Sequence, residues 1–216
     1  KEEDILSSQA YIKKGTVLNE LIKSCVMDKD ANPDDLIVGD RTALTMAIRI
    51  TGYGTKYDVN ITCRHCGATN ETNVDLSELP IKTLEISPVK EGENLFEYVL
   101  PVCKKKVLFK FLTGKDEAER NKSIESMQNL YGESYLGNVT KGIESHIISI
   151  DGVTKKSAIN AFIDKMPAFD SKSLRNFIKR SEPGIDTKLN YKCPSCSGES
   201  EVDLPITTNF FWPTLE

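Results

Sequence analysis

Two short stretches, Cys63-Arg64-His65-Cys66 and Cys193-Pro194-Ser195-Cys196, decide how this chain is expected to fold. They contain four of its 6 cysteines. A thiolate is a soft ligand that suits Zn²⁺, and two intervening residues allow both sulfurs of one tight turn to reach the same ion. Two such turns complete a closed tetrahedral site. We therefore predict one structural zinc per chain, bound by Cys63, Cys66, Cys193 and Cys196.

The residues around the two Cys-x-x-Cys knuckles are also alike. Residues 56–81 and 188–206 both show a strand pattern, a knuckle, a second strand pattern, Asp-Leu and then Pro-Ile. Alternating apolar residues, such as Tyr57, Val59 and Ile61, are typical of strands with one buried face. Each segment is therefore predicted to form one hairpin of a zinc ribbon.

The long separation of the knuckles predicts the domain organisation. Roughly 126 residues lie between Cys66 and Cys193. Closing such a loop costs on the order of 4 kcal/mol of chain entropy, which the roughly 10–16 kcal/mol from a structural zinc can offset. We predict an α+β protein in three parts. Residues 1–81 form N-terminal helices and the first hairpin, 82–187 form a mixed α/β insertion, and 188–216 form the second hairpin and an aromatic tail.

Other roles for the cysteines fit less well. A redox dithiol is expected beside a thioredoxin-like βαβ unit, and neither knuckle has one. Disulfides require an oxidising compartment, whereas the scattered Cys25 and Cys103 favour a reducing cytoplasm. A catalytic zinc needs an open coordination position, which four thiolates do not leave. His65 is an alternative ligand, but its position inside the turn favours an outward-facing side chain.

Composition limits the possible partners. The net charge of −4 argues against a protein that coats nucleic acid, and the basic clusters at 104–106 and 155–156 are not interleaved with aromatic residues. No apolar run is long enough to cross a bilayer, and the sequence starts without an apolar signal segment. We therefore expect a soluble protein with neither nucleic acid nor membrane as its partner.

Catalytic motifs are also missing from the sequence. It contains no Gly-rich phosphate loop, Gly-x-Ser-x-Gly elbow or His-Glu-x-x-His, and only 2 histidines. His146 has no partner that the sequence identifies. We predict that the protein is not an enzyme and has no small-molecule substrate. The rival functions are a nucleic-acid-binding zinc-ribbon protein and a zinc-dependent hydrolase.

The other elements follow from periodicity and capping residues. Helices are predicted at 17–27, 41–50, 115–131, 157–166 and 171–180, with a helix and a short extended piece at 135–150. Strands are predicted at 83–86, 95–100 and 107–112. Expected helix caps are Thr16, Asn32 before Pro33, Asp40, and Asp170 or Ser171. Helical spacing places Cys25 on a buried face.

The chain ends with consecutive aromatic residues at 210–212, followed by Pro213. Three adjacent aromatic side chains cannot all face one core from a strand or tail. Some must pack into a groove of this chain or contact a partner. Trp212 is a large apolar side chain, and burying it would contribute several kcal/mol, on the order of the figures for full side-chain burial.

Several strings together indicate a family. They are Leu-Asn-Glu-Leu-Ile at 18–22, Asn-Pro-Asp-Asp-Leu-Ile-Val-Gly-Asp-Arg at 32–41, Ala-Ile-Arg-Ile-x-Gly-Tyr-Gly at 47–54, the two knuckles, and Asn-Phe-Phe-Trp-Pro at 209–213. This order resembles the baseplate hub family of T-even-like contractile-tailed bacteriophages. The likeness covers residues 16–81 and 190–213, and does not extend to the insertion.

The resemblance implies a non-enzymatic hub subunit or a factor that assembles the hub. Such a protein would work in the host cytoplasm during assembly, reach the virion tail as a subunit, and bind other hub or tail proteins. The resemblance also marks Gly39, Asp40 and Arg41, and the residues Phe210, Phe211, Trp212 and Pro213, as positions of partner contact. From the residues alone, Asp40 is explained as a helix cap. Arg41 can pair with a carboxylate or stack on Trp212.

Overall fold

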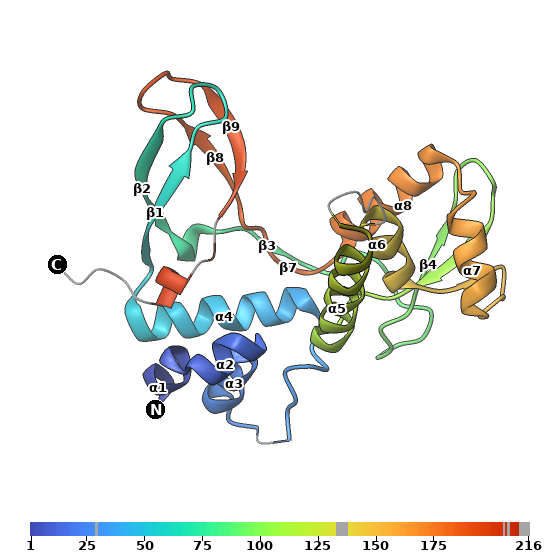
Figure 1. Cartoon of the computed structure of the whole chain (residues 1–216), viewed down its shortest axis with the longest axis horizontal. Coiled ribbons are helices and arrows are strands. Elements are labelled where there is room, and N and C mark those ends of the chain that lie inside the picture. The colour runs from blue at the N-terminus through green and yellow to red at the C-terminus, as the bar shows by residue number, and fades with distance from the viewer. Residues whose placement is uncertain (29, 133–137, 205, 207, 212–216) are drawn as a thin grey trace. The chain divides into compact units, whose positions relative to one another are not determined.

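The computed structural model describes residues 1–28, 30–132, 138–204, 206 and 208–211. In this part of the chain helices are combined with small antiparallel sheets, which confirms the α+β class (Figure 1). The chain divides into two compact units. Unit 1 comprises Lys1–Ala31, Arg41–Lys82 and Gly184–Glu216, and unit 2 comprises Asn32–Asp40 and Thr83–Pro183.

Unit 1 begins with three short helices, α1 (Glu2–Ser7), α2 (Gln9–Lys14) and α3 (Val17–Cys25). Leu21 and Ile22 are buried on α3, as its spacing predicts. The predicted burial of Cys25 is wrong, because the thiol is exposed. The helix ends at this residue rather than near Met27, so its last turn lies at the edge of the packed face.

Two hairpins follow the helices of unit 1. β1 (Lys56–Thr62) pairs with β2 (Thr69–Asp75), and β8 (Lys188–Lys192) pairs with β9 (Glu199–Asp203), both antiparallel. Burial alternates strictly along β1, so Tyr57, Val59 and Ile61 face the core. The short strands β3 (Ile81–Lys82) and β7 (Gly184–Ile185) also pair. Two 3₁₀ turns, η1 (Leu76–Glu78) and η3 (Thr208–Phe211), complete the unit.

One apolar cluster joins these elements. It draws on the N-terminal helices, both hairpins and the C-terminal 3₁₀ turn, and includes Leu6, Leu21, Met46, Tyr57, Val59, Ile61, Val74, Leu76, Tyr191, Val202, Leu204, Phe210 and Phe211. The two ends of the chain therefore share a single core.

Unit 2 has a core of its own. The antiparallel sheet β4-β5-β6 contains Phe96–Val99, Lys106–Phe109 and Ile147–Ile150. Its helices are α5 (Gly114–Tyr131), α6 (Asn138–His146), α7 (Lys156–Ile163) and α8 (Ala168–Ser181). The buried cluster contains Phe96, Leu100, Val107, Phe109, Phe111, Ile143, Ile147, Ile150, Ile159, Ile163, Leu174 and Ile178.

Three predictions about local structure before the first hairpin and in the insertion are wrong. Helix α4 (Val38–Tyr53) starts at Val38, whose N–H donates to the carbonyl of Leu112, so Asp40 lies in the first turn and is not its cap. Asn32 opens a turn rather than a helix, because its Oδ1 accepts the N–H of Asp34 at 3.2 Å. Residues 83–86 form no strand.

Asp170 is a further correction. It lies inside α8, which starts after Pro167, and its carboxylate is fully buried. The carboxylate accepts the N–H of Val102 at 2.7 Å and that of Cys103 at 3.0 Å. It therefore satisfies the backbone of a distant turn instead of capping its own helix.

Candidate metal centre

The four knuckle cysteines come together at the ends of the two hairpins. Their Sγ atoms all lie within 4.8 Å of one another. The distance from Cys63 to Cys196 is 3.7 Å, and that from Cys66 to Cys193 is 3.8 Å. A disulfide needs about 2.05 Å, whereas a tetrahedral zinc with Zn–S bonds of about 2.3 Å places its sulfurs about 3.8 Å apart. The four thiols can therefore hold a metal ion.

The two knuckles have the same backbone geometry. Cys63 N–H donates to Ala68 O at 2.9 Å, and Gly67 N–H donates back to Cys63 O at 2.9 Å. In the second knuckle Cys193 N–H donates to Gly198 O at 2.9 Å, and Ser197 N–H to Cys193 O at 2.8 Å. Gly67 and Ser197 both adopt a positive φ, at 74° and 59°. The first cysteine of each pair is buried and the second is exposed.

The thiols differ in acidity because they interact with one another. Burial disfavours the Cys193 thiolate, but the N–H groups of Cys196 and Ser195 and the neighbouring thiols outweigh burial and lower its pKa to about 6. The N–H of Gly198 favours the Cys196 thiolate, yet contact with Cys66, burial and the other two thiols raise its pKa to about 12. The first thiolate of the cluster thus forms readily, and its negative charge opposes ionisation of a second thiol. A metal ion would supply the positive charge that permits further ionisation.

Side chains from the first hairpin reach the second knuckle. Asn70 on β2 donates from Nδ2 to Tyr191 Oη at 3.0 Å and to Cys193 Sγ at 3.6 Å, and its Oδ1 accepts from Ser195 Oγ at 3.1 Å. Sequence reasoning missed Asn70, because an asparagine in a polar strand gives no signal of a cross-hairpin role. Its contact with Cys193 places it among the groups that orient the cluster.

His65 lies outside the four-sulfur cluster. Its side chain is exposed, as predicted for an outward-facing residue. Its Nε2 lies 3.1 Å from Glu199 O on β9. A Cβ at Gly198 would lie only 2.7 Å from His65 Cδ2, so the ring packs closely over this glycine. His65 therefore links the first knuckle to the second without being a ligand.

Arg49 ties the C-terminal segment to the first hairpin. This fully buried guanidinium donates to Phe210 O at 2.6 Å, Gly54 O at 2.7 Å and Lys56 O at 2.9 Å. It also lies over the ring of Tyr53, 5.5 Å from its centroid. Burial lowers the pKa of Arg49 from its ordinary value. Sequence patterns do not predict a buried arginine at this position, since arginine side chains are mostly exposed in folded proteins.

The residues predicted to contact a partner differ in their exposure to solvent. Phe210 and Phe211 are buried, and Phe210 packs edge-to-face on Tyr57 with ring centroids 5.1 Å apart. These two rings therefore pack within the chain. Trp212 and Pro213 lie outside the described residues. Asp40 is exposed, and Arg41 Nη2 donates to Asn19 Oδ1 at 2.5 Å.

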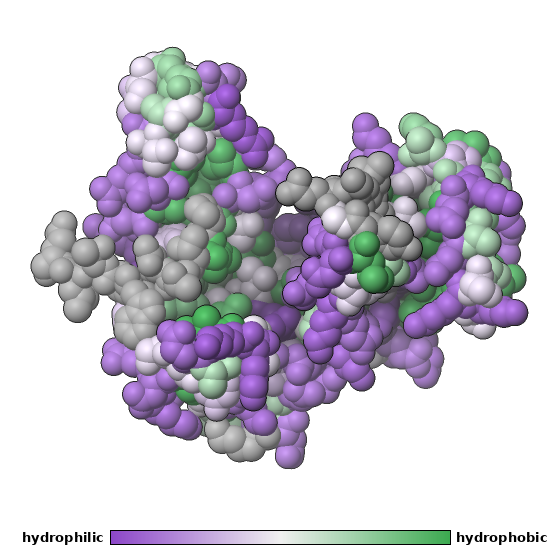
Figure 2. All heavy atoms as spheres, viewed as in Figure 1, coloured by the Kyte–Doolittle hydropathy of each residue, from purple (hydrophilic) through white to green (hydrophobic). Residues whose placement is uncertain are grey.

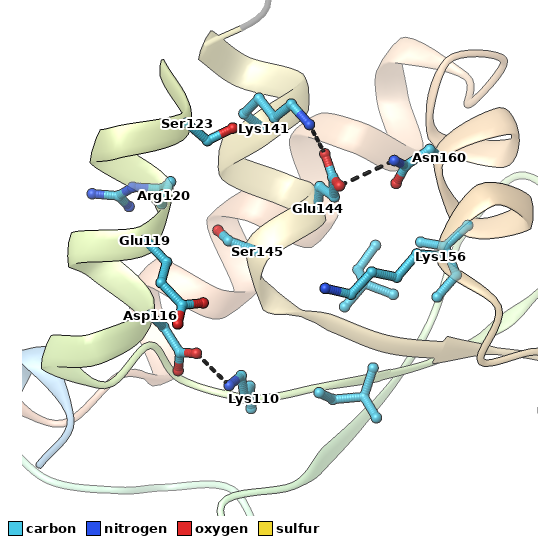
Figure 3. A pocket seen from close by; sticks show the side chains of 13 residues that line it. Lys110, Asp116, Glu119, Arg120, Ser123, Lys141, Glu144, Ser145, Lys156 and Asn160 are labelled. Atoms are coloured by element: carbon cyan, nitrogen blue, oxygen red, sulfur yellow. Dashed lines mark hydrogen bonds and ion pairs between the residues drawn. The ribbon is translucent and has the colours of Figure 1, made fainter. Parts of the chain in front are cut away.

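A polar pocket of about 300 Å³ lies in unit 2 between α5, α6, β6 and α7 (Figure 3). Its charges largely neutralise one another. Lys110 pairs with Asp116 at 2.7 Å and Lys141 with Glu144 at 2.7 Å. The described residues that line it include neither histidine nor cysteine. His146 lies elsewhere, with Nδ1 2.9 Å from Lys110 O, and burial lowers its pKa. The Ser145 hydroxyl in its lining donates to Gly142 O at 2.8 Å and not to a base.

Comparison with known proteins identifies a family. The model of a family described as T4 bacteriophage base plate protein matches residues 2–212. No curated protein and no solved structure matches the chain. Among the described residues, no helix combines the length and the apolar character needed to span a membrane.

Proposed function

The chain belongs to the family of T4 bacteriophage base plate proteins, and from this premise we propose that it is a non-enzymatic component of the baseplate hub. The family match over residues 2–212 carries this proposal. The hub assignment rests on the strings at 32–41, 47–54 and 209–213, which resemble the hub proteins of contractile-tailed phages. The protein would act in the host cytoplasm during assembly, as a hub subunit or as a factor that builds the hub.

Two of these sequence segments, 47–54 and 209–213, are in contact, which supports a shared role in the core of unit 1. Arg49 belongs to the string at 47–54 and Phe210 to the terminal string, 161 residues away. The buried hydrogen bond between them supports a shared structural role for the two strings. These strings maintain the core of unit 1, and partner contact falls to residues on its surface.

The cysteine cluster would bind one structural Zn²⁺ per chain. Zinc suits four thiolates in a tetrahedral arrangement, and four protein ligands leave no position for substrate or activated water. The ion would fix the two hairpins against each other, because neither two-stranded sheet is expected to be stable alone. The bound metal would therefore have a structural role in holding the hairpins for partner binding, and not a catalytic role.

Other hub or tail proteins are the proposed partners. Acidic side chains outnumber basic ones on the four hairpin strands, with Asp58, Glu71, Asp75, Glu199, Glu201 and Asp203 against Lys56, Lys188 and Lys192. This excess negative charge would repel the phosphate backbone of nucleic acid. The ribbon hairpins are thus better suited to protein than to DNA.

The hub proposal is tested in phage assembly. A phage lacking this gene product is complemented with tagged wild-type protein, and hubs, wedges and finished tails are purified and probed for the tag. Presence in hub intermediates and finished tails identifies a subunit, and presence in hub intermediates alone identifies an assembly factor. Recovery only with wedges, or with no tail structure, overturns the proposal.

The metal proposal has a separate test. Freshly purified protein is expected to contain about one zinc per chain, and Cys193→Ser to lose it. Cys25→Ser is the matched control, because this exposed cysteine lies outside the cluster. A wild-type protein purified without metal, or a Cys193→Ser variant that retains it, contradicts the four-thiolate site.

A further inference from the structure

A groove in unit 1 separates the outer edges of β2 and β8. It has a volume of about 530 Å³ and is lined by Ile61, residues 71–75, residues 78–80, residues 188–192 and Pro194. We name it the β2–β8 groove. In the described part of the chain each hairpin is a two-stranded sheet, so neither β2 nor β8 has a strand on its groove side.

Backbone groups of β2 point into this groove. Cys63 N–H donates to Ala68 O, and Leu76 N–H donates to Thr55 O. Because hydrogen-bonded and non-hydrogen-bonded residue pairs alternate along an antiparallel hairpin, these two bonds identify which residues of β2 bond to β1. In this phase Thr72 and Val74 bond to β1. The N–H and C=O groups of the intervening Glu71 and Asn73 therefore point away from β1.

The second hairpin shows the same arrangement. Leu204 N–H donates to Thr187 O, and Cys193 N–H donates to Gly198 O. With the observed register, the backbone of Leu189 and Tyr191 bonds to β9, and that of Asn190 points away from it. Two unpaired strand edges thus border one groove.

The floor and the rim of the groove differ in polarity. Its floor includes the apolar residues Ile61, Val74, Leu79, Leu189 and Tyr191. Figure 2 shows apolar side chains between the polar outer surfaces of the hairpins. A strand laid along this floor could bury alternate apolar side chains.

The rim carries excess negative charge. Lys188 and Lys192 are neutralised across the second hairpin by Glu201 and Glu199, the latter at 3.3 Å. Among the described residues, Glu71 and Glu78 form no ion pair, and both line the groove. A ligand with basic side chains would complement this rim.

We propose that the β2–β8 groove binds an extended segment of another hub protein by strand addition, a segment in which apolar residues alternate with lysine or arginine. Main-chain hydrogen bonds to the two open edges would hold it. Its apolar side chains would face the floor, and its basic side chains would pair across strands with the acidic rim. This inference rests on the proposed function, because it specifies the partner surface of a hub component.

The test uses a capped seven-residue peptide of alternating lysine and valine, titrated into zinc-loaded full-length protein and followed by amide NMR. Shifts are expected at Glu71, Asn73 and Asn190. A peptide of alternating glutamate and valine should bind at least tenfold more weakly. Absence of binding at millimolar lysine–valine peptide, or shifts that map elsewhere, overturns the proposal.

Proline substitutions test the backbone contacts. Asn190→Pro removes an N–H that faces the groove without breaking a bond to β9, a position where an edge strand accepts proline. It should weaken peptide binding at least tenfold. Asn60→Pro is the matched control, since Asn60 is an exposed, uncharged residue of β1 whose N–H faces the hairpin edge opposite the groove. The affinity of this control variant for the peptide should change less than twofold. Equal effects of the two substitutions contradict strand addition.

The same variants separate this inference from the proposed function. If Asn190→Pro protein enters hubs normally and binds peptide like wild type, the groove proposal fails while the hub assignment stands. If wild-type protein binds the peptide but is absent from hubs, the hub assignment fails instead.

Discussion

The two units of this chain hold their cores together in different ways. The core of unit 1 is built from three separate segments, and it includes two of the four clustered cysteines, Cys63 and Cys193. Unit 2 is nearly continuous in sequence, and its core contains the packed rings of Phe96, Phe109 and Phe111. The comparison indicates that the core of unit 1 must bring together segments far apart in the chain, whereas the core of unit 2 forms within a nearly continuous segment.

The sheets show why this difference arises. Two-stranded hairpins are marginally stable in water, whereas three strands packed against helices can be stable alone. Unit 1 contains only two-stranded sheets among its described residues, and unit 2 contains the three-stranded sheet. The hydrogen bonds of Arg49 and the packing of the C-terminal rings join distant segments of unit 1, and a metal held by the four thiols would add a further link.

Loss of the metal should produce the largest difference in stability between the two units. A structural zinc contributes about 10–16 kcal/mol, which is as much as the whole stability of a typical domain, about 5–15 kcal/mol. Chelation, or Cys193→Ser, is therefore expected to unfold unit 1 while unit 2 stays folded. Hydrogen exchange should show lost protection in β1, β2, β8 and β9 and retained protection in β4, β5 and β6.

Cys103→Ser is the control for this experiment, because Cys103 lies in unit 2 and outside the cluster. It should leave the protection of unit 1 unchanged. Retained protection of both hairpins after complete metal removal would show that unit 1 does not need the crosslink.

Arg49→Met should have the next largest effect. It preserves much of the side-chain volume but leaves the carbonyls of Phe210, Gly54 and Lys56 without their donor. A buried group left unsatisfied costs about 1–3 kcal/mol, so we expect unit 1 to lose about 3 kcal/mol or more. Denaturant unfolding of the zinc-loaded protein, followed by hairpin amide signals, measures this loss. Arg120→Met in unit 2 should not affect these signals, and an equal effect would exclude a specific role for Arg49.

Local patterns in the sequence were sufficient to predict the hairpins and the grouping of the four cysteines. Alternation identified the inward residues of β1, and thiol spacing supplied the long-range constraint that joins the two ends. Helix α5 was predictable for the same reason, since its propensity and its boundaries are local. The strand expected at 83–86 did not form, because β propensity requires a pairing strand.

The residues that sequence reasoning missed have partners far away in the chain. Asp170 resembles a helix cap, yet it bonds to the N–H of Val102, 68 residues away. Arg49 resembles an exposed helical arginine, yet its acceptor Phe210 is 161 residues away. Asn70 resembles an ordinary polar strand residue, yet its amide contacts Cys193. Their roles depend on tertiary contacts that a single sequence does not reveal.

Asp170 gives a smaller test, this time in unit 2. Burial opposes ionisation of its carboxyl group, but hydrogen bonds from Val102 and Cys103 outweigh burial and hold the pKa of Asp170 below its ordinary value. Its contribution to stability is therefore present above about pH 4 and is lost as the pH falls through the lower folded-state pKa. Asp170→Asn should cost unit 2 about 1–3 kcal/mol at neutral pH.

The difference between wild type and Asp170→Asn should shrink as the pH is lowered below 4. Denaturant unfolding of unit 2, followed by β5 amide signals from pH 7 to pH 3, measures it. Asp164→Asn is the control, because Asp164 is an exposed aspartate in the same unit. A pH-independent difference would mean that the Asp170 charge is not what stabilises the turn.

Gly198→Ala should have the smallest effect, and it tests whether protein contacts as well as metal join the knuckles. The added Cβ would lie 2.7 Å from His65 Cδ2 and 3.2 Å from Cys196 Sγ, so the ring must move away from Glu199 O. We expect zinc-loaded unit 1 to lose about 1 kcal/mol. Gly52→Ala is the control, since a Cβ there meets nothing within 4 Å and alanine favours its helix.

A double-mutant cycle with His65→Ala completes this test. If the ring is what the new Cβ displaces, the double variant should be more stable than the sum of the single effects predicts, with a coupling of about 0.5–1 kcal/mol. Additive effects would instead place the cost at the thiol of Cys196, within the cluster itself. In that case the His65 ring would add no link of its own between the knuckles, and their dependence on the thiol cluster would contrast more sharply with unit 2.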